Sequence, residues 1–590
     1  MPTITRRELT IAIVWSLLMM LITSWPYVEG SVLAQGRYFC GLISAVDDGN
    51  AYLQWIRQVS DGSITNHNQY TTEPHEGLSF NCFLFGLGSL ARVANLAPPQ
   101  VFQIGRVLAG SFCLVSFFLL ACTFSQDRAF RWISVALVSL GSGLGWLFYL
   151  SFGNGSPIHP IDYGAGWVYQ PEAITFASLL INPLFAFSMG LICLSLVTAM
   201  RAIDTGRARW ALAAGACLLL LANAHTYDII GVHLTVIAWL AIAVATRRCT
   251  TWRALGHYAI MFAMTLPAVA YQWHVMDADP VYRAKADTET LSGPIGDYIT
   301  GYGISWVLAL GGIIWLWRTK APERGRLAHL IPWFIAASAI IYLPVPWQRK
   351  AVEGLHFPIC LLAAVALAKG LGGWLERRSS AQGSVEARLV VVALAVLLLS
   401  MPSNVLFFAD CLHHVRTNNA DLAGVLMPQL YLDPGEYEAC RTLSEIGSRS
   451  DVVMCSSMLG SHVPALTPCR VVAGHWAETI HLNPSVPRDR AIGLPFHKYA
   501  LPAVTRFFSA SADAESREHL LDVFGVTYVI AGPIEDRIYL GSLPTGAEYR
   551  PGMAAEALAA MPHLRVAHRS GDVTLFRVTK SRGREAHDDA

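Results

Sequence analysis

Long apolar blocks separated by short polar stretches dominate the first 410 residues of the chain. Each block is about 18 to 25 residues long, which is the length a helix needs to cross a hydrocarbon core of roughly 30 Å. We predict about eleven transmembrane helices, over residues 11–27, 101–124, 132–152, 173–200, 210–224, 229–246, 254–272, 298–317, 327–345, 355–374 and 387–408. The pattern is that of a polytopic α-helical membrane protein.

Loop charges give these helices a direction, because short cytoplasmic loops carry an excess of Lys and Arg. With the N-terminus in the cytoplasm, every internal loop is basic. These loops hold Arg128 and Arg131; Arg201, Arg207 and Arg209; Arg247, Arg248 and Arg253; Arg318, Lys320, Arg324 and Arg326; Arg377, Arg378 and Arg388. The outer loops 153–172, 225–228 and 273–297 contain only two Lys or Arg residues, Arg283 and Lys285. An odd number of spans then places the C-terminal part outside the cytoplasm, and we expect the chain in the plasma (inner) membrane.

The first apolar block, 11–27, is either a signal peptide ending near residues 31–34 or an uncleaved anchor. We favour the anchor, because the apolar part is long for a signal peptide. Both interpretations put the loop 28–100 outside the cytoplasm. That loop is too long and too apolar for a simple connector, so we expect it to hold structure of its own.

An amphipathic helix should begin near Asp48 in this loop. Its apolar residues recur at helical spacing: Ala51, Tyr52, Trp55, Ile56 and Val59. We predict that it lies at the membrane surface, with Tyr52 and Trp55 at headgroup depth. The segment 78–96 is a second such helix or a short re-entrant one.

After residue 410 the apolar runs shrink to strand length, at 452–454, 471–473 and 526–530, and are rich in β-branched residues. Polar segments of helical periodicity, such as 512–524, alternate with them. We therefore predict two parts: a transmembrane domain over 1–409 with the large outer loop 28–100, and a soluble, extracytoplasmic α/β domain over 410–590.

Composition agrees with this division and excludes one class of partner. Hydrophobic residues make up 53% of the 590 residues and charged residues 14%, with a mean hydropathy of +0.41. A net charge of +1, without a long basic tract, argues against nucleic acid. The 12 cysteines show no zinc-site spacing, and those at Cys411, Cys440, Cys455 and Cys469 leave one or two disulfides open.

Two polar segments of the first outer loop could carry chemistry. Asp47 and Asp48 at the start of a helix could deprotonate an acceptor hydroxyl or hold a divalent cation. They could also simply cap the helix. The segment 70–77 contributes Glu73 and His75, and its alternative interpretation is a plain loop.

Two further segments lie at the outer membrane boundary. His225 and Asp228 occupy a depth at which ionisable residues are costly and tend to be functional. A hydrated hairpin is the alternative, and a metal site that includes His233 is less favoured because His233 should lie within the next helix. Arg349 and Lys350, against the charge trend of outer loops, suit a phosphate or pyrophosphate, or anionic lipid headgroups.

The predicted topology puts all these groups on one face of the membrane, where a site could assemble. They are Asp47, Asp48, Glu73, His75, Asp162, Glu172, His225, Asp228, Arg349 and Lys350. The chain has no phosphate loop of ATPases, no serine-hydrolase elbow and no HExxH zinc helix. Secondary transport would place charges near the bilayer midplane instead.

Together these features resemble the GT-C class of polytopic glycosyltransferases, which includes protein O-mannosyltransferases, oligosaccharyltransferase catalytic subunits and lipid A aminoarabinose transferases. The resemblance rests on a first span followed by a large outer loop with an acidic pair and an aromatic amphipathic helix. It also rests on the segment 70–75 leading into 81–84, and on 348–350 preceding Glu353-Gly354. Two departures are Gly49-Asn50 after the acidic pair and the absence of a WWDYG-like sequence, which argues against oligosaccharide transfer to asparagine.

The resemblance implies a sugar donor linked to polyprenyl phosphate and a lipid, glycan or protein acceptor. It implies Asp48 as the catalytic base with Asp47 beside it, and Arg349 and Lys350 as the groups that hold the donor phosphate. Glu73 and His75 would shape the acceptor site or, with the two aspartates, a divalent-cation site. No cofactor is certain. We expect four residues to complete the substrate site: Tyr52, His225, Asp228 and Glu353.

We therefore predict a glycosyltransferase that acts outside the cytoplasm with inversion at the anomeric carbon. Two other functions stay open. One is a non-enzymatic membrane protein that binds or translocates lipid-linked glycans, and the other is a scaffold of an envelope-assembly complex.

Overall fold

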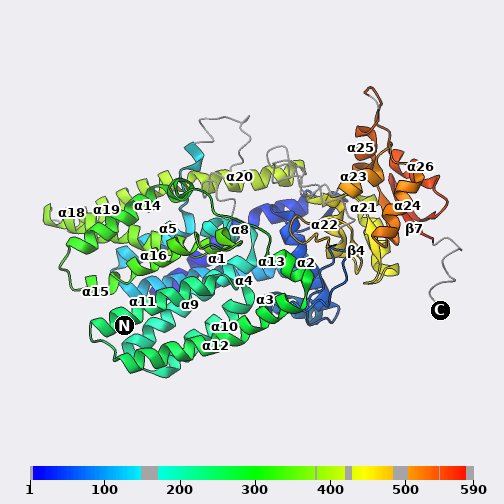
Figure 1. The fold of residues 1–590 in the computed structure, drawn as a ribbon. Coiled ribbons are helices and arrows are strands. Elements are labelled where there is room, and N and C mark those ends of the chain that lie inside the picture. The colour runs from blue at the N-terminus through cyan, green and yellow to red at the C-terminus, as the bar shows by residue number, and fades with distance from the viewer. Residues whose placement is uncertain are drawn as a thin grey trace.

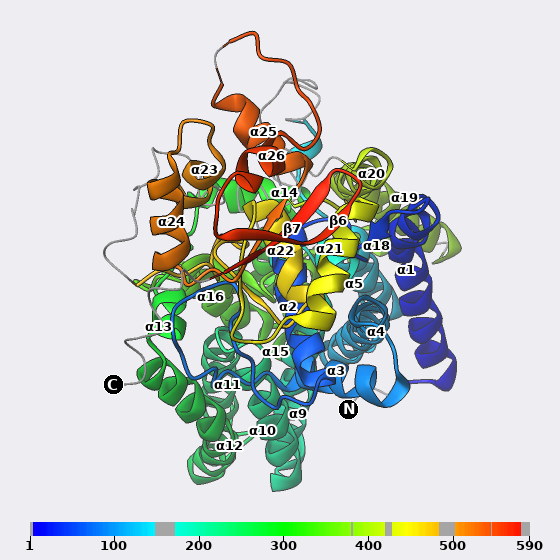
Figure 2. The ribbon, with the colours of Figure 1, turned by 90° about the vertical axis from the view of Figure 1, so that its right-hand side faces the viewer.

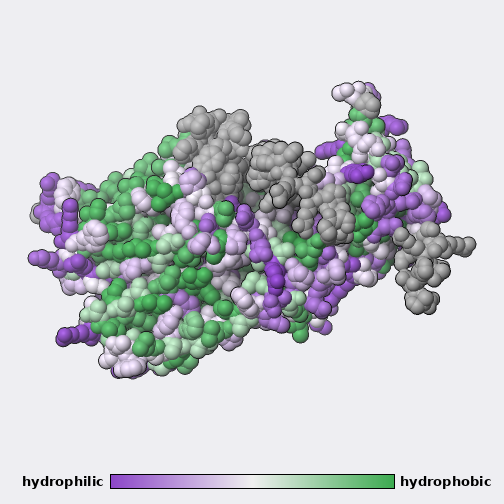
Figure 3. Space-filling model, in the orientation of Figure 1, coloured by the Kyte–Doolittle hydropathy of each residue, from purple (hydrophilic) through white to green (hydrophobic). Residues whose placement is uncertain are grey.

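A helical bundle fills one end of the molecule and a C-terminal sheet region lies beyond the other end (Figure 1). The computed structural model describes residues 4–147, 171–378, 382–418, 428–482, 502–543 and 545–579. Apolar side chains cover the flank of the bundle, whereas hydrophilic ones gather at its far tips and on the C-terminal region (Figure 3). This distribution is that of a multi-pass membrane protein.

Seven helical segments within the described residues are long and apolar enough to cross a membrane. They are α1 (Arg6–Val32), α4 (Pro98–Phe124), α9 (Pro183–Thr205), α11 (Asp228–Ala245), α12 (Thr251–Ala278), α14 (Ile295–Arg318) and the segment Gln348–Arg378, which comprises η2 (Gln348–Val352), α17 (His356–Ala364), η3 (Val365–Leu371) and α18 (Gly372–Arg378). An eighth would be α19 (Gln382–Ser400) with α20 (Pro402–Thr417), which meet at a bend of 45°.

Shorter helices complete the bundle and its connecting loops. They are α2 (Val46–Ser60), α3 (Cys82–Ala94), α5 (Arg128–Leu140), α8 (Thr175–Ile181), α10 (Ala208–Ala224), α13 (Pro280–Ala286), α15 (Arg324–Leu327) and α16 (Leu330–Ile340). A 3-10 turn, η1 (Pro171–Ala173), precedes α8.

Each predicted span overlaps a helix, but the predicted count of about eleven is not confirmed. The difference lies in four predicted spans. Those at 132–152, 210–224 and 327–345 fall on helices of 13, 17 and 11 residues, and the one at 387–408 falls on the bent pair of α19 and α20. In the predicted span 132–152, α5 ends at Leu140, and the Leu144 N–H then donates to the Thr300 carbonyl of α14, 2.9 Å away. The rest of that span, from 148, lies outside the described residues.

Ion pairs join the loops that the charge pattern assigns to the cytoplasm. Asp204, in the last turn of α9, accepts from Arg248 and from Arg326 at 2.6 Å each. Lys369 pairs with Asp127 and with Glu323 at 2.8 Å each. These contacts place the loops at one common end of the bundle, as the predicted topology requires; the compartment at that end stays a prediction.

The C-terminal region is built on a five-stranded mixed sheet of order β4-β3-β5-β7-β6. Its elements are β2 (Tyr431–Leu432), α21 (Pro434–Ile446), β3 (Val452–Met454), α22 (Ser457–Leu466), β4 (Arg470–Val471), α23 (Pro502–Phe508), α24 (Ala514–Val523), β5 (Tyr528–Ala531), α25 (Pro533–Gly541), α26 (Met553–Ala559), β6 (Leu564–Ser570) and β7 (Val573–Val578). Strands β3, β4 and β5 are parallel, whereas β7 runs antiparallel to β5 and β6. Viewed from this end, β6 and β7 lie in front of the bundle with helices around them (Figure 2).

The sheet is apolar on both faces, which explains its unbroken apolar strands. Val452 and Met454 pack into one hydrophobic cluster, and Val453 with Cys455 into another. Successive side chains of a strand point to opposite faces, so each face buries every second residue. The predicted strands at 452–454, 471–473 and 526–530 and the helix at 512–524 are thus confirmed within a residue or two at most boundaries.

The long segment between α1 and α4 packs against the C-terminal region. The short strand β1 (Tyr38–Phe39) pairs antiparallel with β2, and the Asn50 amide lies 3.1 Å from the Ser461 hydroxyl of α22. Helix α2 is therefore covered by protein on most sides, and its predicted place at the membrane surface stays a prediction. Its apolar face serves protein contacts, since Tyr52 stacks against Phe102 with ring centroids 6.5 Å apart.

Two expectations about the C-terminal region change in detail. The predicted boundary at 409/410 falls inside α20, because its last turns, with His414 buried, remain helical to Thr417. All twelve cysteines lie in the described residues and are free thiols, so the disulfides left open for Cys411, Cys440, Cys455 and Cys469 do not form here.

The contact between α2 and α3 predicts opposite effects for two glycines of α3. A Cβ at Gly88 would lie 2.8 Å from the Ile56 carbonyl of α2, whereas a Cβ at Gly86 would meet nothing within 4 Å. We expect Gly88→Ala to destabilise the protein by about 1–3 kcal/mol through overpacking, and Gly86→Ala to stabilise it by roughly 0.5–1 kcal/mol through helix propensity. Thermal unfolding in detergent measures both, and equal effects would contradict the packing.

Candidate active site

Helix α2 presents the acidic pair in its first turn. Its N-cap is Ala45, held in the left-handed region at φ 45°, so capping does not account for Asp47 and Asp48. The helix dipole stabilises negative charge at these positions. Asp47 is 2% exposed, whereas the Asp48 side chain is 47% exposed, so only the second carboxylate is open to a substrate.

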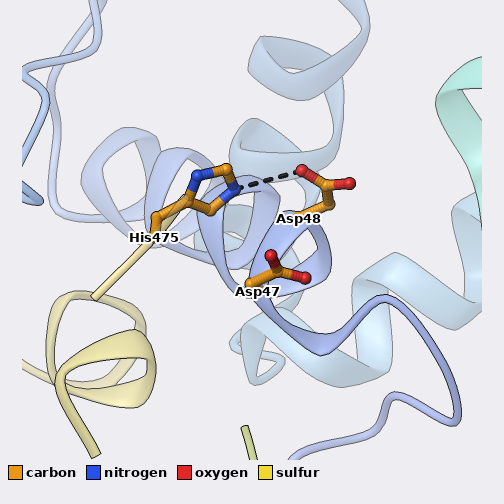
Figure 4. A group of neighbouring side chains, drawn as sticks. All are labelled: Asp47, Asp48 and His475. Atoms are coloured by element: carbon orange, nitrogen blue, oxygen red, sulfur yellow. Dashed lines mark hydrogen bonds and ion pairs between the residues drawn. The ribbon is translucent and has the colours of Figure 1, made fainter. Parts of the chain in front are cut away.

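Asp48 is held by a histidine of the C-terminal region. His475 Nε2 lies 3.1 Å from Asp48 Oδ1, and Asp47 stands beside them (Figure 4). The imidazole is buried between the Tyr70 ring and Trp476, with ring centroids 5.6 and 6.2 Å away. These contacts fix the orientation of the imidazole and, through it, of the Asp48 carboxylate.

The hydrogen bonds of His475 determine its tautomer. Nδ1 accepts from the backbone N–H groups of Ala477 and Glu478, both at 3.0 Å. A neutral imidazole has one proton, which is then on Nε2 and is donated to Asp48.

This tautomer decides how well the cluster would suit a metal ion. Ligand atoms of Asp47, Asp48 and His475 lie within 4.8 Å of one another. A cation on Nε2 would have to displace the proton while Nδ1 still accepts two N–H groups, which an ordinary neutral imidazole ligand does not do. The two carboxylates fit a cation, but His475 does not, and we derive no catalytic step through one.

The surroundings keep Asp48 ionised. Burial opposes the charged form, but the hydrogen bond from His475 and the charges of Lys350 and Lys285 outweigh it and lower the pKa of Asp48. Lys285 is itself paired with Glu478 of the C-terminal region.

A second cluster forms at the boundary of α10 and α11. His225 Nδ1 lies 2.9 Å from Asp228 Oδ2 and 3.3 Å from Glu353 Oε2. His233, the third member of the metal site considered from the sequence, lies instead within α11, where its Nε2 is 3.3 Å from the Thr265 hydroxyl. Glu353, from the segment after Arg349 and Lys350, lies beside His225 instead.

Residues between the two clusters interact electrostatically with both of them. Glu172, in η1, interacts with Asp48 as well as with His225 and Arg349. Burial raises the pKa of Glu172 to about 7. The Lys350 ammonium lies 5.3 Å from the centre of the Tyr227 ring. The site thus gathers segments 45–50, 171–173, 225–228, 347–353 and 475–478.

Solved structures that share this architecture include two glycosyltransferases. An oligosaccharyltransferase from Archaeoglobus fulgidus, with a tethered acceptor peptide, is 12% identical; the match covers 88% of this chain and 69% of that chain at a TM-score of 0.51. The arabinofuranosyltransferase AftD from Mycobacteria is 13% identical; the match covers 98% of this chain and 42% of that chain at 0.53. No family model and no curated protein sequence matches.

The fold is that of the GT-C class. At such low identity the similarity shows the GT-C fold alone, and this chain spans less than half of the AftD chain. The GT-C resemblance inferred from the acidic pair and the outer loop is confirmed at the level of the fold.

Within the GT-C fold, Glu73 and His75 serve a different contact from the one predicted. Glu73 Oε1 accepts from the Leu482 N–H at 2.7 Å, and His75 Nε2 accepts from the Asn68 N–H at 3.0 Å. Both side chains tie the loop 66–79 together or to the C-terminal region, and neither belongs to the carboxylate cluster found among the described residues. Their part in substrate or metal binding stays a prediction.

Sequence reasoning missed His475 and the role of Glu172, and Asp162 lies outside the described residues. A signal for His475 exists, since His475-Trp476 follows the apolar run 471–473 after the single residue Gly474. A polar residue at the end of a buried strand often belongs to a site. Nothing in the sequence pairs this histidine with an aspartate 427 residues earlier.

Proposed function

We propose that this chain is a GT-C glycosyltransferase that transfers a sugar from a polyprenyl-phosphate-linked donor to an acceptor outside the cytoplasm. The observation that carries the proposal is the half-exposed Asp48 carboxylate, which His475 orients and which lies within electrostatic reach of Lys350. A base, an orienting group and a phosphate-binding cation are the parts such a transfer needs.

In the proposed reaction, Asp48 accepts the proton of the acceptor hydroxyl. The acceptor oxygen forms a bond to the anomeric carbon as the bond from that carbon to the donor phosphate oxygen breaks, which inverts the configuration. The electron pair leaves with the polyprenyl phosphate, whose charge Arg349 and Lys350 stabilise. Both cations belong to η2, at the start of the Gln348–Arg378 segment, where a lipid phosphate would lie.

Tyr52 would contribute to the sugar site. It stands one turn after Asp48 on α2, and burial together with the Asp48 charge raises its pKa well above the usual value. Its hydroxyl is therefore a neutral hydrogen-bond donor at every physiological pH.

Asp48→Asn should lower the transfer rate by about 100-fold or more, because the amide cannot accept the hydroxyl proton. The assay incubates purified protein with a panel of polyprenyl-phosphate monosaccharides and measures released polyprenyl phosphate. Asp61→Asn is the matched control, since Asp61 ends the same helix in a partly exposed ion pair with Arg57 at 2.6 Å. Full activity of Asp48→Asn would exclude Asp48 as the base. Stoichiometric donor binding without turnover by the native protein would instead favour a carrier of lipid-linked glycans.

The hydrogen bond from His475 to Asp48 should determine how the rate of the same reaction depends on pH. Asp48 acts as a base when ionised, so activity falls as pH drops through its pKa, which lies below the usual value. Replacing His475 by Asn keeps an acceptor for the backbone but removes the donor to Asp48. The pKa of Asp48 should then rise, and the acid limb of kcat/KM should move to higher pH.

His475→Gln is the matched comparison, because its amide can donate where Nε2 does, and it should move the acid limb less than His475→Asn. Equal pH profiles of the two variants and the native protein would show that His475 does not position Asp48.

Lys350→Met should raise KM for the donor by about 10- to 100-fold, which corresponds to the 1.5–3 kcal/mol of a charge-assisted hydrogen bond. The KM for a water-soluble acceptor should change little. Lys320→Met, in the opposite loop between α14 and α15, provides the control. A donor KM that is the same in both variants would remove Lys350 from donor binding.

A further inference from the structure

We propose that His225, Asp228 and Glu353 form a binding site for one divalent transition-metal cation of the Zn²⁺ or Mn²⁺ type. The site is separate from the Asp47, Asp48 and His475 cluster. The proposal concerns cation binding and does not depend on the transferase function.

The spacing of the three side chains suits a metal ion. His225 Nδ1 lies 2.9 Å from Asp228 Oδ2 and 3.3 Å from Glu353 Oε2, and the three ligand atoms fall within 4.8 Å of one another. In a tetrahedral site with bonds of about 2.0 Å to nitrogen and oxygen, neighbouring ligand atoms lie about 3.3 Å apart. A small inward adjustment would place all three on one ion.

Unpartnered carboxylate oxygens point to a ligand. Neither oxygen of Glu353 receives a hydrogen bond from an N–H or hydroxyl group of the described residues, and Oδ1 of Asp228 receives none either. The nearest polar neighbours of the Glu353 carboxylate are the Asp228 carboxylate and His225 Nδ1. Both side chains are 0% exposed, so water does not solvate them as it would at a surface. Such buried oxygens destabilise the folded protein unless a cation or a proton satisfies them.

The charged side chains nearby do not neutralise the Glu353 and Asp228 carboxylates. Glu172 adds a third carboxylate within electrostatic reach of Glu353, and Lys350 and Arg349 are the nearby cations. The Lys350 ammonium faces the Tyr227 ring, and the unpartnered state of both Glu353 oxygens shows that neither cation donates to them.

His225 also differs from His475 in the ring nitrogen that it has free of backbone hydrogen bonds. His225 Nδ1 faces two carboxylates and no backbone N–H in the described contacts, so a neutral imidazole protonated on Nε2 could direct its Nδ1 lone pair at a cation. One nitrogen and two carboxylate ligands suit Zn²⁺ or Mn²⁺ better than Ca²⁺, which takes six to eight oxygen ligands. Phe185 and Tyr227 flank the imidazole, with ring centroids 5.8 and 5.5 Å away.

The rival explanation is a proton shared between Asp228 and Glu353, which would satisfy the same oxygens without a metal. The test uses full-length protein in detergent, stripped with a chelator, incubated with Zn²⁺ or Mn²⁺ alone and desalted. Elemental analysis should find about one ion per chain, and the ion should raise the unfolding temperature.

Glu353→Gln keeps the side-chain shape and should lose both the ion and the thermal shift, while Asp48→Asn should retain both. Three results would overturn the proposal: no ion on the native protein, which favours the shared proton; an ion kept by Glu353→Gln; or an ion lost by Asp48→Asn, which would place it at the other cluster. Because unfolding is measured without added metal as well, a misfolded Glu353→Gln is recognised, and Glu353→Asp, which should weaken but not abolish ion binding, then takes its place.

Discussion

The hydrogen bond between His475 and Asp48 joins the two halves of this molecule, and the geometry of the site depends on it. Asp48 lies in the first turn of α2, between the first two membrane-spanning helices, and His475 belongs to a turn after β4, 427 residues away. The imidazole can orient the carboxylate only if the C-terminal region stays packed against α2. Contacts such as Asn50 with Ser461, the Tyr70 hydroxyl with the Ser461 carbonyl at 2.9 Å, and β1 with β2 maintain that packing.

The structure explains why Gly49 and Asn50 follow the acidic pair, where the GT-C pattern has a bulkier residue. A Cβ at Gly49 would lie 2.6 Å from Leu42, so a bulkier residue would push α2 away from the loop before it. Asn50 has an amide that reaches α22. These two residues serve the packing of α2 rather than its chemistry, and they allow the helix to lie close between the bundle and the C-terminal region.

Charge is divided between the two ends of the bundle, because the apolar interior cannot solvate it. At one end, Arg248, Arg326 and Lys369 neutralise carboxylates across loops. At the other end, carboxylates collect around a few cations and are less completely paired. The first arrangement stabilises the bundle, whereas the second leaves groups available for a proton, a phosphate or a cation.

What the sequence alone determined was the class of the fold and the end of the bundle at which the candidate groups gather. Hydrophobic run length and loop charge are local properties, and they predicted the helices, the strands at 452–454 and 526–530, and the gathering of Asp48, Asp228 and Lys350 at one end. Tertiary structure decided which residues meet: His475 in place of Glu73 and His75 beside Asp48, and Glu353 in place of His233 beside His225. The reason is physical. The membrane imposes its constraint on every residue in turn, so a single sequence records it, but a contact across hundreds of residues depends on packing and tautomer, which no local pattern encodes.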